Sequence, residues 1–175
     1  CVANTMVRGK QMTVTWHVDN LKVSHEDPAE IMKFTNYLAV IYGEALTVHR
    51  GKIHDYLGVD LDYMTKGKVG VSMIKYVDQI LEGFSEELGA PAATPAAEHL
   101  FQVRNDSEAE YLSEEKAQEF HHITAQLLFL SARSRRDIQV TVAFLTTRVK
   151  KPDTDDWGKL RRVLKYLKGT KHMKL

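Results

Sequence analysis

The chain has 175 residues, 43% of them hydrophobic, which is enough to bury a real core in one or two small domains. No stretch approaches the roughly 18 consecutive apolar residues of a membrane span, and no charged-then-apolar leader opens the chain, so we expect no membrane association. The single cysteine excludes an internal disulfide framework and fits a reducing compartment. Because that cysteine, not a methionine, is the first residue, we expect a piece of a longer protein.

The net charge of +1 conceals a strong asymmetry along the chain. Residues 1–130 hold 11 Lys and Arg against 19 Asp and Glu, a balance of −8, whereas residues 131–175 hold 13 against 4, a balance of +9. A basic segment of this kind is typical of a surface that meets a polyanion such as nucleic acid. The alternative is an ordinary basic helix face that balances an acidic neighbour within one fold.

The N-terminal sequence predicts strands. Alternation of apolar and polar residues predicts a strand near residues 2–7, then an Arg-Gly-Lys turn and a hairpin over residues 13–25. We place the tight turn of this hairpin at Asp19 and Asn20, because an Asp-Asn pair tolerates the positive φ of a hairpin turn. A carboxylate therefore lies at the hairpin tip, either as part of a turn or presented there for chemistry.

A helix is predicted next, with Asp27 as N-cap and Pro28 as its first residue, ending near Gly43. Residues 53–63 and 68–74 then predict two strands of a second hairpin. Apolar residues at helical spacing predict a further helix from about residue 76 that ends by residue 89.

Composition changes over residues 89–108, which are rich in alanine and proline and have no sustained period. We interpret them as a connecting segment and a domain boundary. Beyond it the pattern is helical: one helix begins near Glu114, a second covers residues 137–149, and a third closes the chain. The order predicts an α+β fold. The apolar stripe of the last helix comprises Trp157, Leu160, Val163, Leu164 and Leu167.

Five blocks of this sequence, in order, resemble the reverse transcriptase of copia-type (Pseudoviridae) retrotransposons. They read HVDNLKVSH, HDYLGVDLDY, TPAAEHLF, FHHITAQLLFLSARSRRDIQVTVAFLTTRV and WGKLRRVLKYLKGT. The family has at these places a Tyr-Val-Asp-Asp hairpin, a Leu-Gly segment, a Thr-Pro loop, a helix start like TRPDI and a Tyr-Leu-Lys-Gly-Thr ending. The resemblance covers essentially the whole chain, and its last block is the most specific.

The resemblance implies an α+β fold in two parts. Residues 1–74 correspond to the end of a palm, with antiparallel hairpins and a helix, and residues 75–175 to an all-helical thumb and connection. Leu57, Gly58 and Val59 match the position of the family's primer grip, where a close backbone approach suits glycine. The alternative for Gly58 is a bulge inside a strand.

The resemblance also implies a role for the first hairpin. In the family the first aspartate of the hairpin tip joins an earlier aspartate to hold two Mg²⁺ ions for nucleotidyl transfer. Asp19 matches that first aspartate and is the expected metal ligand and catalytic residue, whereas Asn20 stands where the second acid belongs. The other aspartate would lie upstream. We therefore expect this chain alone to be inactive and to bind Mg²⁺ weakly.

The basic C-terminal helix is the candidate for nucleic-acid binding. An amphipathic cationic helix can lie on a membrane, bind a partner or follow phosphates, and the resemblance favours contact with an RNA/DNA template–primer. These cations are expected to face away from the apolar stripe, so that neutralising them changes stability little. The residues are Arg161, Arg162, Lys165 and Lys168.

The function implied is a fragment of an RNA-directed DNA polymerase, whose partners are the template–primer and the rest of a polyprotein. That remainder would include upstream fingers and palm and a downstream RNase H, in an intracellular setting such as a virus-like particle or the nucleus. The alternative is a non-catalytic relic or a nucleic-acid-binding module derived from such an element. Asp60 and Asp62 could be mistaken for a catalytic pair, although strand carboxylates of this spacing commonly face solvent.

Overall fold

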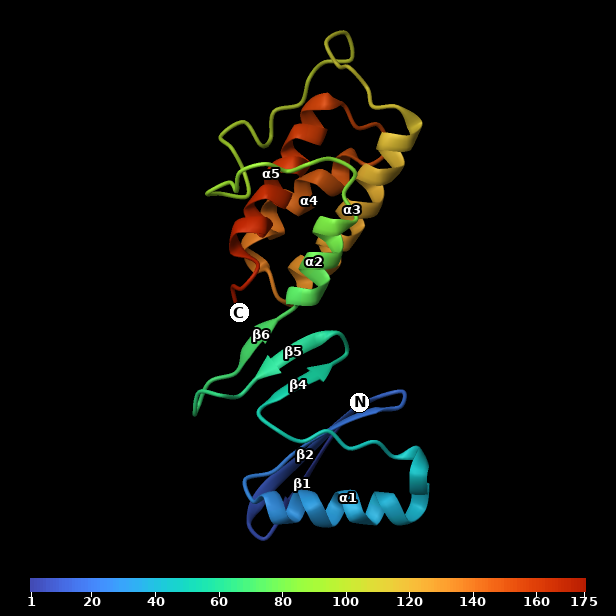
Figure 1. Cartoon of the computed structure of the whole chain (residues 1–175), viewed down its shortest axis with the longest axis vertical. Coiled ribbons are helices and arrows are strands. Elements are labelled where there is room, and N and C mark those ends of the chain that lie inside the picture. Colours follow the sequence, from blue (N-terminus) through green and yellow to red (C-terminus); the bar gives the residue numbers. More distant parts are fainter.

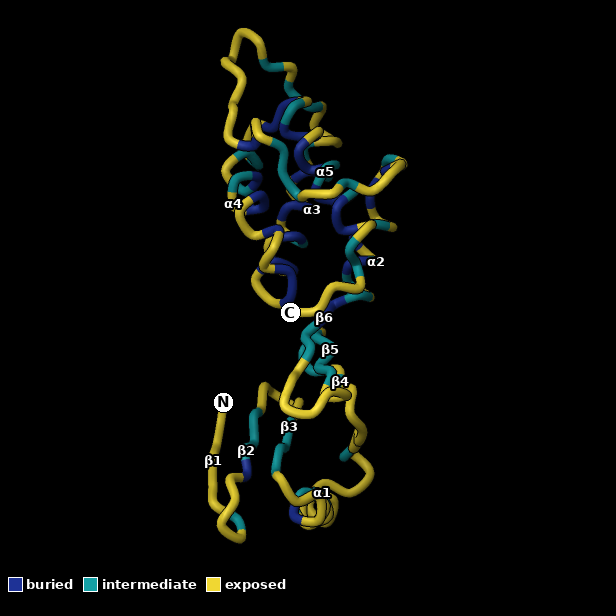
Figure 2. The backbone as a smooth tube through the Cα atoms, turned by 90° about the vertical axis from the view of Figure 1, so that its left-hand side faces the viewer, coloured by how far each residue is buried: buried dark blue, intermediate teal, exposed yellow.

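The alternating N-terminal residues form a three-stranded antiparallel sheet. In the computed structural model, which describes residues 1–175, its strands are β1 (Val2–Val7), β2 (Lys10–His17) and β3 (Asn20–Ser24), with β2 in the centre. Helix α1 (Pro28–Tyr42) lies at the lower end of the molecule, on the β3 side of this sheet (Figures 1 and 2). Its predicted start is confirmed, because Asp27 accepts a hydrogen bond from the Ala29 N–H at 2.9 Å. It ends as predicted at Gly43, with φ 55°.

A second antiparallel sheet follows a short 3₁₀ turn (Gly43–Ala45). Its strands are β4 (Ile53–Tyr56), β5 (Val59–Asp62) and β6 (Gly70–Ser72), in the order β4-β5-β6. The prediction of one strand over residues 53–63 is therefore wrong. The chain turns back at Leu57 and Gly58, so this stretch is itself a hairpin with a two-residue turn.

The remaining helices pack into one body at the other end of the elongated molecule (Figure 1). They are α2 (Ile74–Glu82), α3 (Glu114–Arg133), α4 (Gln139–Arg148) and α5 (Thr154–Thr170), with a 3₁₀ turn (Arg136–Ile138) before α4. Helix α2 ends at Glu82, within the predicted limit of residue 89, and the connecting segment runs over residues 83–113, longer than the predicted 89–108. That segment contains no helix or strand beyond an isolated bridge between Tyr111 and Asp153.

The hydrophobic core lies entirely in the helical body. Its 18 buried residues all fall between Met73 and Leu167, and the apolar stripe of α5 runs through its centre. In residues 1–72, by contrast, only Met12, Glu30 and Ser72 are buried. Figure 2 shows this contrast as a largely exposed lower half below a helical body with a buried interior. The packing energy of the molecule is therefore concentrated in one of its two halves.

The C-terminus returns to the second sheet and ties the halves together. Leu175 and Val71 exchange backbone hydrogen bonds of 2.9 and 3.0 Å, as an antiparallel pair does. Lys174 pairs with Asp62 at 2.5 Å. No helix of the chain combines the length and the apolar character needed to cross a bilayer.

Candidate nucleic-acid interface

The first hairpin presents its carboxylate as predicted at the tip, but the turn is placed differently. Strand β2 ends at His17 and β3 begins at Asn20, which pairs with His17, so the connecting residues are Val18 and Asp19. The positive φ of the turn falls on Val18, at 55°. The assignment of the turn to Asp19 and Asn20 is therefore wrong by one residue, because register with β2 draws Asn20 into the strand.

Asp19 is exposed and its nearest polar partner is local. Its Oδ1 accepts a hydrogen bond from the Asn20 Nδ2 at 3.1 Å. No group of three or more His, Cys, Asp or Glu side chains gathers anywhere in a way that could hold a metal ion. Mg²⁺ takes near-octahedral oxygen ligands, commonly from one or two carboxylates with substrate phosphates. Asp19, whose carboxylate is hydrogen-bonded to the Asn20 amide, can supply only one of the ligands of such a site.

The Leu57–Gly58 turn lies against the helical body. Both residues have positive φ, 56° and 75°, as a type I′ turn requires. The Leu57 carbonyl accepts a hydrogen bond from Arg133 Nη1 at 3.3 Å, and Val59 packs against the core. A bulge at Gly58 is thus excluded. The glycine is explained by the turn, and any contact with a primer remains a prediction.

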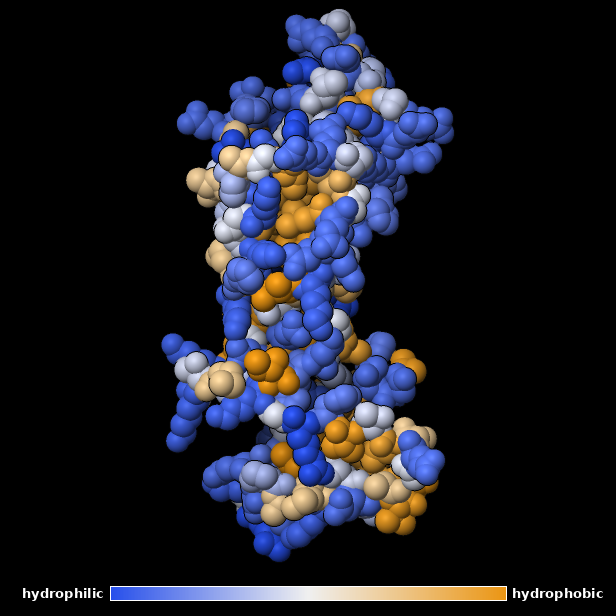
Figure 3. Space-filling model, in the orientation of Figure 1, coloured by the Kyte–Doolittle hydropathy of each residue, from blue (hydrophilic) through white to orange (hydrophobic).

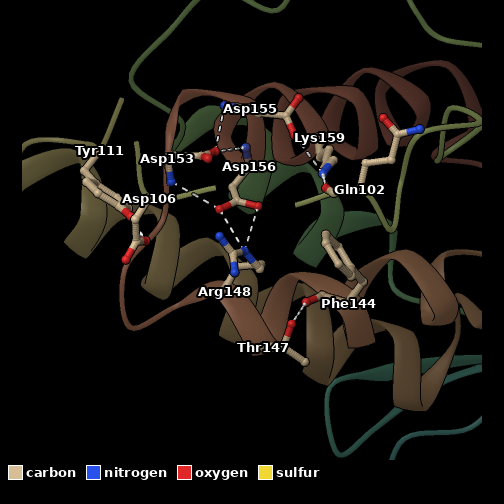
Figure 4. Close-up of polar contacts among 10 residues, drawn as sticks. All are labelled: Gln102, Asp106, Tyr111, Phe144, Thr147, Arg148, Asp153, Asp155, Asp156 and Lys159. Carbon is tan, nitrogen blue, oxygen red and sulfur yellow. Dashed lines mark hydrogen bonds and ion pairs between the residues drawn. The ribbon is translucent and has the colours of Figure 1, made fainter. Parts of the chain in front are cut away.

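Helix α5 is fixed at its start by a buried polar network (Figure 4). Asp153 caps the helix by accepting the N–H groups of Asp155 and Asp156, each at 2.9 Å, and Asp156 accepts the Asp153 N–H at 3.1 Å. Asp156 also pairs with Arg148 Nε at 3.0 Å. Burial raises the pKa of the Asp156 carboxyl above its ordinary value, despite these hydrogen bonds. The network sets the direction in which the basic face of α5 points.

The cations of α5 hold the connecting segment rather than standing free in solvent. Arg161 Nε lies 3.1 Å from Glu86 Oε2, Arg162 Nη2 donates to Thr94 Oγ1 at 2.9 Å, and Lys168 Nζ donates to the Gly89 carbonyl at 3.0 Å. Three of the four side chains therefore anchor this segment, a structural role that the sequence analysis did not foresee. Only Lys165 has neither a side-chain hydrogen bond nor an ion pair, and it is half-buried.

Charge compensation runs through the whole basic segment. Seven of its 13 cations pair with carboxylates, and four of those carboxylates belong to the acidic part of the chain. Part of the basic excess, four of the 13 cations, therefore pairs with the acidic part of the chain, as the alternative interpretation of the asymmetry predicts. The four acidic-part partners are Asp62, Asp78, Glu86 and Asp106.

The structure does not bring all the predicted site residues together. The sheet that carries Asp19 lies in the lower half of Figures 1 and 2, and α5 lies in the upper half. Arg161, Arg162 and Lys165 do meet, because they line one hollow between α5 and the connecting segment, whereas Lys168 lies outside it. Gly158 also lines this hollow and was not predicted. An isolated glycine within a helical pattern was the one signal that pointed to it.

Comparison with known proteins finds relatives of low identity, among them two plant proteins. The chain is 28% identical, over 120 residues, to an Arabidopsis thaliana protein described as an uncharacterized mitochondrial protein; the match covers 69% of this chain and 47% of that protein. It is 26% identical over 110 residues to the retrovirus-related Pol polyprotein from transposon TNT 1-94 of Nicotiana tabacum, covering 61% of this chain and 8% of the polyprotein. The second similarity supports a retroelement origin for the chain.

The chain spans less than half the length of either curated relative. No protein-family model and no solved structure matches it.

Proposed function

We propose that this chain is a segment of the reverse transcriptase of a copia-type retrotransposon polyprotein. Residues 1–74 would form the end of the palm, and residues 75–175 the thumb and connection. The observation that carries the proposal is the similarity to a Pol polyprotein over 110 residues. Two further features support it: the five sequence blocks occur in the family's order, and two antiparallel sheets with a helix precede a purely helical body.

In this proposal the chain contributes nucleic-acid binding and one carboxylate, and other parts of the polyprotein complete the polymerase. Two-metal nucleotidyl transfer needs several oxygen ligands around a pair of Mg²⁺ ions. Asp19 offers one carboxylate, so a second aspartate must come from an upstream part of the palm. The partners are then an RNA/DNA template–primer, the upstream fingers and palm, and a downstream RNase H.

Asn20 favours a second candidate, a non-catalytic relic or a nucleic-acid-binding module derived from such an element. An amide in place of the second acid removes a full negative charge beside two divalent cations. Even changes in the outer shell of a metal site commonly cost about 10–100-fold in metal affinity or activity. The flanking genomic sequence separates the two candidates, because only the first requires an open frame that reaches an upstream palm aspartate and a downstream RNase H.

The polymerase part of the proposal is tested by primer extension. The purified chain is mixed with a DNA primer annealed to an RNA template, deoxynucleotides and Mg²⁺, beside an active reverse transcriptase as positive control. We expect no incorporation, because one carboxylate cannot hold two metal ions. Incorporation by the parent chain that disappears in Asp19→Ala would contradict this expectation.

The binding part is tested by the salt dependence of affinity for a primer–template duplex. If about four cations reach phosphates, log K should fall with log salt with a slope of roughly −3 to −4. Changing Arg161, Arg162, Lys165 and Lys168 together to Gln should remove most of that slope.

A charge-matched control changes Arg50, Lys52, Lys66 and Lys68, four exposed cations outside the helical body, to Gln. It should retain the parent slope. Equal loss in both variants would mean that net charge, not α5, governs binding. Because Arg161, Arg162 and Lys168 also anchor the connecting segment, the folded state of the α5 variant must be verified by circular dichroism.

A further inference from the structure

The hollow beside α5 has the size of a ligand site. It encloses about 530 Å³ between the outer face of α5 and residues 90–100 of the connecting segment. The segment is held in place on both sides of the hollow. Lys159 Nζ donates to the Gln102 carbonyl at 2.6 Å, and the Ala92 N–H donates to the Lys165 carbonyl at 3.3 Å. The walls are therefore fixed by hydrogen bonds to the best-packed helix of the molecule.

Two of the cations that line the hollow are not neutralised by the protein. Lys159 pairs with Asp155 at 2.8 Å and Arg161 with Glu86, so these charges are compensated. Arg162 reaches only the neutral hydroxyl of Thr94, and its Nε is buried without any hydrogen-bond partner. Lys165 has no charged partner. A buried donor left unsatisfied by the protein is rare in folded proteins, and an acceptor from outside the chain, a water or a ligand, would satisfy it.

The opposite wall is small and apolar. Alanines and prolines of residues 90–97 supply it, and Gly158 leaves open space on the helix side, since a Cβ built there would meet nothing within 4 Å. A ligand that fits would carry an anionic group for Arg162 and Lys165 and a flatter, less polar part for the other wall. Arginine and lysine bind phosphate through charge-assisted hydrogen bonds, and a nucleotide combines a phosphate with a sugar and a flat base.

We propose that this hollow binds a single nucleoside phosphate unit, with the phosphate between Arg162 and Lys165. One source of that unit is a nucleotide within a nucleic-acid strand, and this source rests on the proposed function. A free mononucleotide has the same chemistry. The site would thus hold one nucleotide unit against α5.

Four variants of the chain test the site. Arg162→Gln and Lys165→Gln each remove one charge from the hollow. Gly158→Leu adds no charge and fills the open space, and it should not lower the unfolding temperature, because leucine favours helix more than glycine does. Arg136→Gln is the matched control, since Arg136 is an exposed cation of the same basic segment without a hydrogen bond or an ion pair.

The probes are adenosine 5′-monophosphate, adenosine and a short single-stranded oligonucleotide, with affinities measured by calorimetry. We expect adenosine 5′-monophosphate to bind and adenosine to bind far more weakly. Each of the three hollow variants should lose at least about tenfold in affinity for the phosphate probe, as for loss of a hydrogen bond to a charged group. Arg136→Gln should change that affinity by less than about twofold.

The outcomes separate the site from the proposed function. Binding of the mononucleotide but not of the oligonucleotide would support the site and contradict nucleic-acid binding. If Gly158→Leu, Lys165→Gln and the control all bind the oligonucleotide with equal affinity, the hollow is not the binding site. Nucleic-acid binding by the chain would still be supported. Binding of no probe would overturn both.

Discussion

At residue 18 a β-branched side chain takes a backbone conformation that such residues rarely adopt. Val18 has φ 55° and is 87% exposed, so no packing offsets the strain of its left-handed conformation. Non-glycine residues in such regions cost on the order of 1–3 kcal/mol and persist when the surrounding structure imposes them. The pairing of His17 with Asn20 imposes the left-handed conformation on Val18 and so places Asp19 at the tip.

Replacing Val18 with glycine should therefore stabilise the hairpin. Glycine adopts positive φ without steric penalty, and this relief of strain exceeds the larger conformational entropy that glycine loses on folding. We therefore expect the free energy of hairpin formation to become more favourable by about 0.5–1 kcal/mol. Val18→Ala is the matched control, because it removes the branch but keeps the Cβ, and it should gain less. Amide hydrogen exchange of β2 and β3 measures the effect. Slower exchange in the alanine variant than in the glycine variant would contradict the explanation by strain.

The connecting segment shows how an element without secondary structure is held by a helix. Residues 83–113 are fixed through carbonyl and hydroxyl groups that α5 cations contact across 68 to 79 positions of sequence. Glu86 adds a charged anchor, because its carboxylate accepts from Lys116 Nζ at 2.7 Å and Trp157 Nε1 at 3.1 Å and pairs with Arg161. One carboxylate thus joins the segment to both α3 and α5.

Local signals in the sequence were sufficient for elements whose ends are set locally. The start of α1 follows from Asp27 and Pro28, and α3 begins at Glu114 as predicted; its cap, Ser113, which accepts the Lys116 N–H at 3.4 Å, was not predicted. The Leu57–Gly58 turn could not be predicted in this way, because it lacks an Asn-Gly or Asp-Gly pair and its conformation is supported by Arg133. The hollow beside α5 could not be predicted either, because its walls are distant in sequence and three of its cations were assigned to nucleic-acid contact along the helix.

The Glu86 anchor should make stability depend on acid pH. The hydrogen bond from Lys116 holds the pKa of Glu86 below its ordinary value. Burial opposes this lowering, and the hydrogen bond from Trp157 and the charge of Arg161 add to it. A depressed pKa contributes stability that is present above the unfolded pKa of about 4.3 and is lost as the pH falls through the folded pKa. Glu86→Gln should therefore lower the free energy of unfolding by on the order of 1 kcal/mol at neutral pH, and by less in acid.

Denaturant unfolding of Glu86→Gln and the parent across this pH range measures that difference. The neighbouring Glu87→Gln is the control, because the Glu87 side chain is exposed and has no ion pair or hydrogen bond. It should match the parent at every pH. If the free energies of unfolding of the parent and of Glu86→Gln differ by the same amount at neutral and acid pH, the ionised form of Glu86 does not contribute to stability.

The whole molecule is uneven in the way it buries apolar surface. The helical body contains the entire 18-residue core, whereas α1 leaves Tyr37 62% and Val40 87% exposed. Figure 3 shows apolar surface at this lower end of the molecule. Small sheets are marginally stable in water unless a helix or another layer covers them well. The N-terminal half therefore depends on its attachment to the helical body more than that body depends on it.

The two tryptophans give a direct test of this unevenness. Trp16 lies in β2 of the weakly buried sheet, and Trp157 is 6% exposed in the helical core, where its ring centroid is 5.3 Å from that of Phe84. With 5-fluorotryptophan in both positions, fluorine NMR follows each half in the same unaltered chain, and Trp16→Phe assigns the two signals. Because little apolar area holds the first sheet, we expect the Trp16 signal to reach its unfolded position at a lower urea concentration than the Trp157 signal. Superimposed transitions would mean that both halves unfold as one cooperative unit, with the contacts of Leu175, Lys174 and Arg133 to the second sheet strong enough to couple them.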